Sequence, residues 1–312
     1  MDIPGRRSRR LLVAAALVPA AALGQQDSAR ARLERARGGA TFLIPAASVL
    51  LPGLGQYMLD AWWDGVPFSA SAALGLGLYL NGDTAAARRT ELPRSPAGQQ
   101  AYFGAQLYQT AGELSAYEVF HRSLPALQGE GKFRFVTHHE PVTALLTAPF
   151  DVRFLRRWTT WVELAYTATV ATVEVVATKP GKVYQPYQLH DALFGTGVSL
   201  QAGIGEEALF RGWLYPVLYQ TLGERFWLAN SLQAGIFGAL HVPQAGPYAL
   251  LISGAFLYEG WLTRRNGWSI REGIFHHFWY DAVIVTVELL TQERLPAAVI
   301  MAPPLRFREP PW

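Results

Sequence analysis

Three ionisable side chains lie within six residues in one of the most apolar stretches of the chain: Glu206, Glu207 and Arg211. The flanking segments 193–204 and 213–222 contain no charged residue and would otherwise continue as membrane helix. An ionised side chain at the centre of a bilayer costs roughly 2.5–3.5 kcal/mol on insertion scales. These three side chains therefore need partners, water or a chemical role.

Helical geometry predicts different surroundings for the two adjacent glutamates. Glu207 and Arg211 are four residues apart and share a helix face, so they can form an ion pair. Glu206 points about 100° away and is left outside that pair. A paired carboxylate beside an unpaired one is typical of sites that separate a structural acid from a reactive one.

The composition of the chain is that of a helical membrane protein. Half of the 312 residues are hydrophobic and only 16% are charged, below the usual quarter. Several apolar runs approach the length needed to cross a bilayer, which predicts an all-α fold, a polytopic transmembrane bundle of about seven or eight helices. The net charge of +3 comes from arginines in short loops, which indicates a lipid bilayer as partner and no nucleic acid. The absence of cysteine excludes disulfides and Cys-ligated zinc.

Composition and charge divide the chain into five segments. These are a signal-like segment or short anchor over 1–29, an N-terminal membrane hairpin module with a Pro-Gly-Leu-Gly-Gln stretch and an amphipathic helix over 38–125, a loop and connecting membrane helix over 126–184, a dense run of membrane helices over 185–295, and a tail over 296–312. Within the dense run, the apolar pattern predicts helices over 189–203, 206–221, 226–242, 246–263 and 273–291.

Further ionisable residues interrupt the predicted helices of the second half. Phe237 and His241 are four residues apart and share a helix face, as do His277 and Asp281. Each ionisable group would be costly against lipid, so we expect them to gather around one polar cavity together with Glu206. The remaining such groups, assigned to helix ends, interfacial contacts or a position off the shared face, are His190, Glu259, His276 and Glu288.

A polar cavity of this composition supports hydrolysis. A desolvated glutamate such as Glu206 can accept a proton from water, and His241 could hold the same water. His277 and Asp281 could hydrogen-bond the oxygen that becomes negative when a carbonyl is attacked. In that role Asp281 is either protonated or orients His277, and both options stay open at this point.

Three motifs stand in order along the second half: Glu206-Glu207-x-x-x-Arg211, Phe237-x-x-x-His241 and His277-x-x-x-Asp281. They resemble the motifs of the CAAX-protease and bacteriocin-processing family (CPBP), which are intramembrane glutamic endopeptidases. The resemblance covers about residues 185–295 and implies a protease acting on a membrane-associated protein or peptide. Together with the signal-like start, it implies a location in a bacterial inner membrane.

The resemblance also implies roles for single residues. Glu206 and His241 would activate water, and His277 with Asp281 would form the oxyanion site. Asp281 stands where the family more often has asparagine, which leaves the number of protons at that site open. Supporting roles pass to the other motif residues, Glu207, Arg211 and Phe237. The expected chemistry uses no cofactor and no metal ion.

Two alternatives remain beside this hypothesis. Two carboxylates and two histidines could ligate a metal ion in a metal-dependent membrane protease, although the pairing of Glu207 with Arg211 would occupy one candidate ligand. A non-catalytic immunity or assembly protein could use the same polar residues to bind a partner or hold its helices together. A second candidate metal site, the adjacent His138, His139 and Glu140, is interpreted as a solvated loop, because structural sites usually space their ligands.

Overall fold

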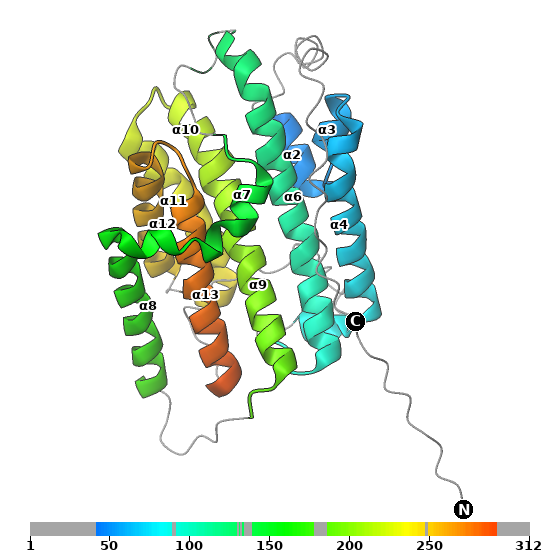
Figure 1. Ribbon diagram of the computed structural model, residues 1–312, viewed down its shortest axis with the longest axis vertical. Helices are drawn as coiled ribbons and strands as arrows, with labels where there is room; N and C mark the ends of the chain where they lie inside the picture. Colours follow the sequence, from blue (N-terminus) through cyan, green and yellow to red (C-terminus); the bar gives the residue numbers. More distant parts are fainter. Residues whose placement is uncertain are drawn as a thin grey trace, which may run out of the picture.

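The computed structural model describes residues 42–88, 92–129, 131, 133, 139–177, 186–246 and 249–291, and every regular element within them is a helix (Figure 1). The helices are α2 (Leu43–Leu50), α3 (Leu54–Met58), α4 (Trp62–Asn81), α5 (Thr84–Ala87), α6 (Pro96–Gly129), α7 (Val142–Thr147), η1 (Ala148–Phe150), η2 (Val152–Arg156), α8 (Trp158–Ala177), α9 (Leu189–Glu207), η3 (Ala208–Leu214), α10 (Tyr215–Thr221), α11 (Phe226–Ala245), α12 (Ala249–Arg265) and α13 (Arg271–Thr291). The predicted all-α class is confirmed. The signal-like segment 1–29 and the tail 296–312 lie outside the described residues.

The helices of the structure do not meet the usual criterion for the membrane spans that the sequence predicts. Across the described ranges, no helix combines the length and the apolar content required to cross a membrane.

Helix α6, with 34 residues the longest helix of the described ranges, lies between α9 and α4 (Figure 1). It packs against α2 and α4 on one side and against α9 on the other. Contact with α4 is close because two glycines face each other: a Cβ on Gly75 would lie 2.6 Å from the Gly104 oxygen, and one on Gly104 would lie 2.5 Å from the Gly75 oxygen. The amphipathic helix predicted within 38–125 corresponds to α6, and most of its residues are buried.

The Pro-Gly-Leu-Gly-Gln stretch turns the chain between α2 and α4. Gly53 has a φ of 93°, a left-handed conformation that favours glycine. Its backbone nitrogen donates to the Ser115 Oγ at 2.9 Å. The Gln56 side chain accepts from that hydroxyl at 2.7 Å and donates to the Ser115 carbonyl at 3.1 Å. These bonds attach the turn to α6.

The segment after α9 corrects one predicted boundary. We expected a break between helices over 189–203 and 206–221, but α9 continues without interruption into η3 and α10. The element η3 is a π-helix, a rare form that is frequently found at functional sites. Gly205 serves close packing instead of a turn, since a Cβ there would lie 2.0 Å from the Glu113 Oε2 of α6.

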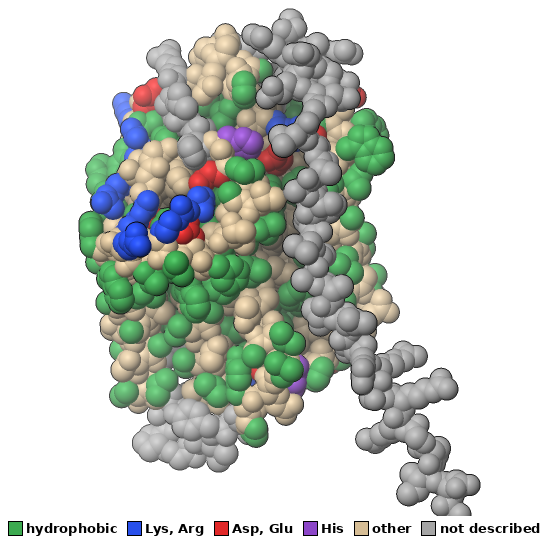
Figure 2. Space-filling view, in the orientation of Figure 1, with side chains coloured by type: hydrophobic (Ala, Val, Ile, Leu, Met, Phe, Trp, Pro, Cys, Tyr) green, Lys and Arg blue, Asp and Glu red, His purple; other side chains and the backbone are tan. Residues whose placement is uncertain are grey.

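Many ionisable side chains are buried in the bundle beside its apolar core, and many large apolar side chains are exposed on its surface. The buried ionisable residues include Glu113, Glu206, Glu207, Arg211, His241, Glu259, Glu272, His276, His277, Asp281 and Glu288. Large apolar side chains, by contrast, are exposed on the outer faces of the helices, for example Trp63 at 83% and Val176 at 76%. Figure 2 shows a band of hydrophobic side chains across the lower part of one face of the bundle, with a group of basic residues above it. A water-soluble domain would normally have the opposite arrangement of charged groups.

Candidate active site

The motif residues come from four elements and lie in the interior of the bundle. α9 supplies Glu206 and Glu207, η3 supplies Arg211, α11 supplies Phe237 and His241, and α13 supplies His277 and Asp281. None of the seven is more than 5% exposed. Helices α9 and α13 pack closely at Gly203, where a Cβ would lie 2.9 Å from the backbone nitrogen of Phe278. This close packing brings the glutamates of α9 to His277.

His277 is the point at which the acids meet. Its Nδ1 lies 3.1 Å from the Glu207 Oε1. Its Nε2 lies 3.6 Å from the Glu206 Oε2 and 3.4 Å from the Asp281 Oδ2. The structure therefore brings together three carboxylates, predicted from two separate motifs, around one imidazole. Asp281 approaches the ring at Nε2 without a hydrogen bond.

Arg211 holds the second glutamate. Its Nη1 lies 3.0 Å from the Glu207 Oε1, so the pair that the four-residue spacing predicts is present. The same oxygen contacts His277, which the spacing did not indicate. The guanidinium carbon lies 3.6 Å from the centre of the Phe256 ring and 5.5 Å from that of Phe237. A buried cation is stabilised by such ring faces, and Glu207 is thereby fixed between two partners.

His241 approaches the cluster across the ring of Phe237. Its Nδ1 donates to the Phe237 carbonyl at 2.7 Å. In the neutral ring the proton therefore lies on Nδ1, and Nε2 carries a lone pair that can accept from a water molecule. This Nε2 is buried and has no hydrogen-bond partner in the part of the chain that the structure describes. The Phe237 ring centre lies 4.3 Å from that of His241 and 6.4 Å from that of His277.

A small cavity adjoins His277 between α8, α12 and α13. Its volume is about 30 Å³, and its lining includes Glu163, Phe256, Glu259, His277 and Tyr280. A cavity needs roughly 10–15 Å³ to hold a water molecule, so one or two fit here. The arrangement thus places room for water directly beside the imidazole that contacts Glu206.

Glu259 is a residue that the sequence analysis placed wrongly. It is not an interfacial contact at a helix end, because it is buried in α12. Its Oε1 lies 3.1 Å from the Nδ1 of His276, whose Nε2 contacts the Thr160 Oγ1 at 3.0 Å. Glu163 and Glu259, like Glu206, are acids within apolar helices, and the cost of a charge in such a helix predicts a polar site for both.

In the loop after α6, His139 and Glu140 belong to no metal-binding group among the described residues. Glu140 accepts hydrogen bonds from the Ser269 hydroxyl at 2.7 Å and the Ile270 backbone at 3.0 Å, and so ties this loop to the start of α13. His138 lies outside the described residues. In the described ranges, no group of three or more His, Cys, Asp or Glu side chains is placed to hold a metal ion.

Comparison with known proteins finds a family match in the second half of the chain. Residues 188–283 match the family described as Type II CAAX prenyl endopeptidase Rce1-like. Over this segment the chain is similar to CAAX proteases. The resemblance that the three motifs predict is confirmed over 96 residues (188 to 283), just under a third of the chain. No curated protein and no solved structure matches the chain.

The matched segment contains all seven motif residues and most of α13, but not every residue around the site. It begins one residue before α9. Glu113 on α6, which packs against Gly205, and Glu163 on α8, which lines the cavity, both precede it. The N-terminal helices therefore contribute acids to the surroundings of the family motifs.

Replacing Gly203 by alanine is expected to separate α9 from α13 at the level of His277. The new Cβ would lie 2.9 Å from the Phe278 nitrogen and 3.1 Å from its Cα, and helix backbones cannot yield as a side chain does. We expect a loss of about 1–3 kcal/mol in the free energy of unfolding, and a fall of about 10- to 100-fold in any hydrolytic kcat/KM as Glu206 and His277 move apart.

The matched control for this substitution is Gly254→Ala on α12. Apart from its chain neighbours and the backbone of its own helix turn, the described part of the chain has no atom within 4 Å of the added Cβ. Thermal unfolding and activity of the two variants are measured side by side. Equal behaviour of both would show that close α9–α13 packing does not set the geometry of the site.

Proposed function

We propose that this protein is an intramembrane endopeptidase of the CAAX type, which hydrolyses a peptide bond of a membrane-associated protein or peptide. The observation that carries the proposal is the contact of Glu206 with His277, 3.6 Å apart on different helices, inside a buried group of acids and imidazoles. The family match over 188–283 supports the same class of reaction.

The location in a membrane is supported by the distribution of side chains. Exposed Trp, Leu and Val side chains surround a bundle whose interior holds Glu, Asp, His and Arg. Lipid is a suitable neighbour for the apolar exterior, and polar groups at membrane depth are expected to face the bundle interior. The outward band in Figure 2 is the surface that we assign to lipid.

In the proposed reaction, Glu206 acts as general base. It takes a proton from water while the water oxygen attacks the carbonyl carbon of the peptide bond. His241 accepts the second water hydrogen at Nε2 as a hydrogen bond and so orients the water. An N–H at the Nε2 of His277 donates to the carbonyl oxygen as it becomes negative. The proton on Glu206 then passes to the leaving nitrogen, the C–N bond breaks, and a carboxylic acid and an amine are released.

Glu207, Arg211 and Phe237 position these groups. Glu207 receives the Nδ1–H of His277 at 3.1 Å, which sets the orientation of that ring. Arg211 neutralises Glu207 at 3.0 Å. Phe237 separates the two imidazoles, and its carbonyl fixes His241.

The experiment that tests the proposal compares membrane proteomes of cells expressing the wild-type chain or Glu206→Gln. We expect protein termini that are present with the wild type and absent with the variant. Identical termini in both, with equal amounts of the two proteins in the membrane, would favour the immunity or assembly alternative.

Removal of metal ions is expected to leave activity unchanged. Glu207, one of the candidate ligands, is occupied by Arg211 and His277, so a metal ion would have to displace a buried cation. Purified protein is treated with a strong chelator, dialysed, and assayed with and without added Zn²⁺. Loss of activity on chelation with recovery on addition of Zn²⁺ would establish the metal-dependent protease instead.

A further inference from the structure

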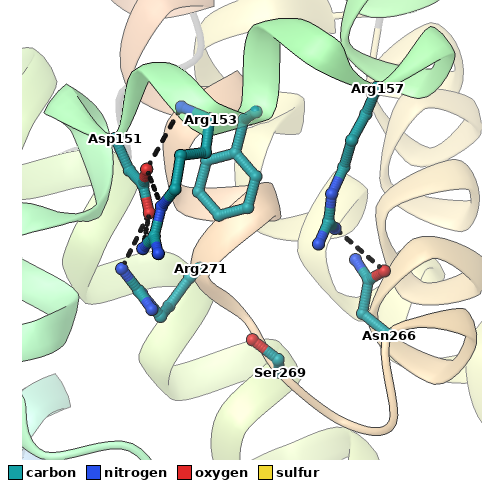
Figure 3. A pocket seen from close by; sticks show the side chains of 7 residues that line it. Asp151, Arg153, Arg157, Asn266, Ser269 and Arg271 are labelled. Atoms are coloured by element: carbon teal, nitrogen blue, oxygen red, sulfur yellow. Dashed lines mark hydrogen bonds and ion pairs between the residues drawn. The ribbon is translucent and has the colours of Figure 1, made fainter.

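A second cavity, of about 420 Å³, opens at the N-terminal end of α13 and is rich in arginine (Figure 3). It is lined by Asp151, Arg153, Arg157, Asn266, Ser269 and Arg271. The residues come from the loop and η2 before α8, from the turn between α12 and α13, and from the first residue of α13. We call it the arginine cavity. It shares no residue with the site around His277.

Positive charge in the arginine cavity exceeds negative charge. The Asp151 Oδ2 accepts from the Arg153 Nη2 at 2.7 Å and from the Arg271 Nη2 at 2.9 Å. Arg157 is paired with Glu272. The lining itself carries three guanidinium groups and one carboxylate and is therefore net positive. Two further carboxylates lie behind it, Glu272 at Arg157 and Glu140 at Ser269. In Figure 3, Arg153 and Arg271 meet at Asp151, and Arg157 lies across the opening from them.

The cavity has donors to offer an anion. Each guanidinium carries five N–H groups, more than two carboxylates and the Asn266 side chain can occupy together. Hydrogen bonding from Arg153 lowers the pKa of Asp151 to about 2, so this carboxylate stays ionised at physiological pH and keeps both of its arginines in place. Arg153 is 71% exposed and Arg157 45%, so their outer N–H groups can be reached from solvent.

Exposed apolar side chains adjoin the arginines. Val152 and Leu155 on η2 are exposed, as are Trp158 and Trp161 at the start of α8. The Trp161 Nε1 donates to the Leu155 carbonyl at 2.9 Å, which ties α8 to η2. Tryptophan side chains are enriched at the level of lipid headgroups. Figure 2 shows the basic group directly above the band of hydrophobic side chains, as expected for a boundary between headgroups and acyl chains.

We propose that the arginine cavity binds the phosphate of an anionic phospholipid headgroup, with the acyl chains lying along Trp158 and Trp161. The inference rests on the membrane location proposed above. Guanidinium groups match the oxygens of a phosphate in pairs. The net positive charge favours a headgroup whose phosphate is not balanced by a cation, such as phosphatidylglycerol over phosphatidylcholine.

A bound headgroup would also set the depth of the active site. His277 follows Arg271 by six residues on α13, which corresponds to about 9 Å along the helix axis. With Arg271 at the level of the phosphates, the acids around His277 lie just inside the acyl-chain region. The substrate bond is then cut at a fixed depth below the headgroups.

The test titrates the detergent-purified full chain with short-chain phosphatidylglycerol, short-chain phosphatidylcholine or inorganic phosphate and counts bound molecules by native mass spectrometry. We expect phosphatidylglycerol to bind about tenfold more tightly than phosphatidylcholine, and the double variant Arg153→Gln/Arg271→Gln to lose about that factor. Arg122→Gln is the matched control, because Arg122 also bridges two carboxylates, those of Asp64 and Glu118, outside the arginine cavity. It should bind phosphatidylglycerol like the wild type.

Three results would overturn the proposal: equal affinity for the two lipids, an affinity for inorganic phosphate equal to that for phosphatidylglycerol, or unchanged binding by the double variant. If the double variant does not fold, the single variant Arg153→Gln is used, because the Arg153 side chain is largely exposed. We expect its affinity for phosphatidylglycerol to fall about threefold. Binding requires no turnover. Failure here therefore leaves the protease proposal standing, and an inactive protease leaves this one standing.

Discussion

Replacing Glu206 by glutamine is expected to abolish peptide-bond hydrolysis in a protein that still folds. Glutamine has nearly the same shape but cannot accept the proton of the attacking water, and the loss of a general base lowers rates by about 100- to 10,000-fold. Glu206 is completely buried, so its replacement by a neutral residue of the same shape leaves the charges on the protein surface unchanged. The measurement is kcat/KM in reconstituted membranes together with the thermal unfolding midpoint of the same preparation.

The control for this substitution is Glu288→Gln. Glu288 is also a buried acid, on the same helix as His277, but its Oε1 receives the Leu92 backbone N–H at 3.4 Å and lies in another part of the bundle. Its replacement should leave kcat/KM within a factor of about three. Retained activity in Glu206→Gln, or equal losses in both variants, would remove Glu206 from the role of general base.

The site was predictable from the sequence where local spacing decides the contact. Glu207 and Arg211 are one helical turn apart, and any helix places them side by side. The gathering of His277 with the glutamates followed from cost, since isolated charges in apolar helices must find one another. The all-α class followed from the same apolar runs.

The contacts that escaped prediction depend on how distant helices pack. Phe256, whose ring covers Arg211, belongs to α12, a helix that carries no motif residue. Glu113 reaches the site only because Gly205 lacks a side chain. The π-helix after Glu207 inserts an extra residue into a turn, and nothing in the order of Ala208–Leu214 distinguishes it from an ordinary α-helix. Sequence periodicity predicts which face of one helix is apolar. The contacts of Phe256 and Glu113 depend instead on how two helices pack against each other.

Replacing Arg211 by methionine is expected to destabilise the fold more than any other single change in the site. Arg211 and Glu207 are both completely buried and 3.0 Å apart. Methionine fills similar space against Phe256 but removes the guanidinium from the Glu207 carboxylate, and breaking a buried pair costs about 3–5 kcal/mol. We expect a large fall in the unfolding midpoint in detergent and little folded protein at growth temperature.

The double variant Glu207→Gln/Arg211→Met separates the two causes of that loss. The double variant also removes the charge of Glu207, so no unpaired carboxylate remains. In the wild type the His277 Nδ1 lies 3.1 Å from the Glu207 Oε1, and a glutamine at position 207 can still accept this hydrogen bond. Most of the stability should return, since replacing both partners of a buried pair is often nearly neutral. A double variant as unstable as Arg211→Met would show instead that the contact of the guanidinium with Phe256 holds η3 against α12, and that the ion pair contributes little to the fold.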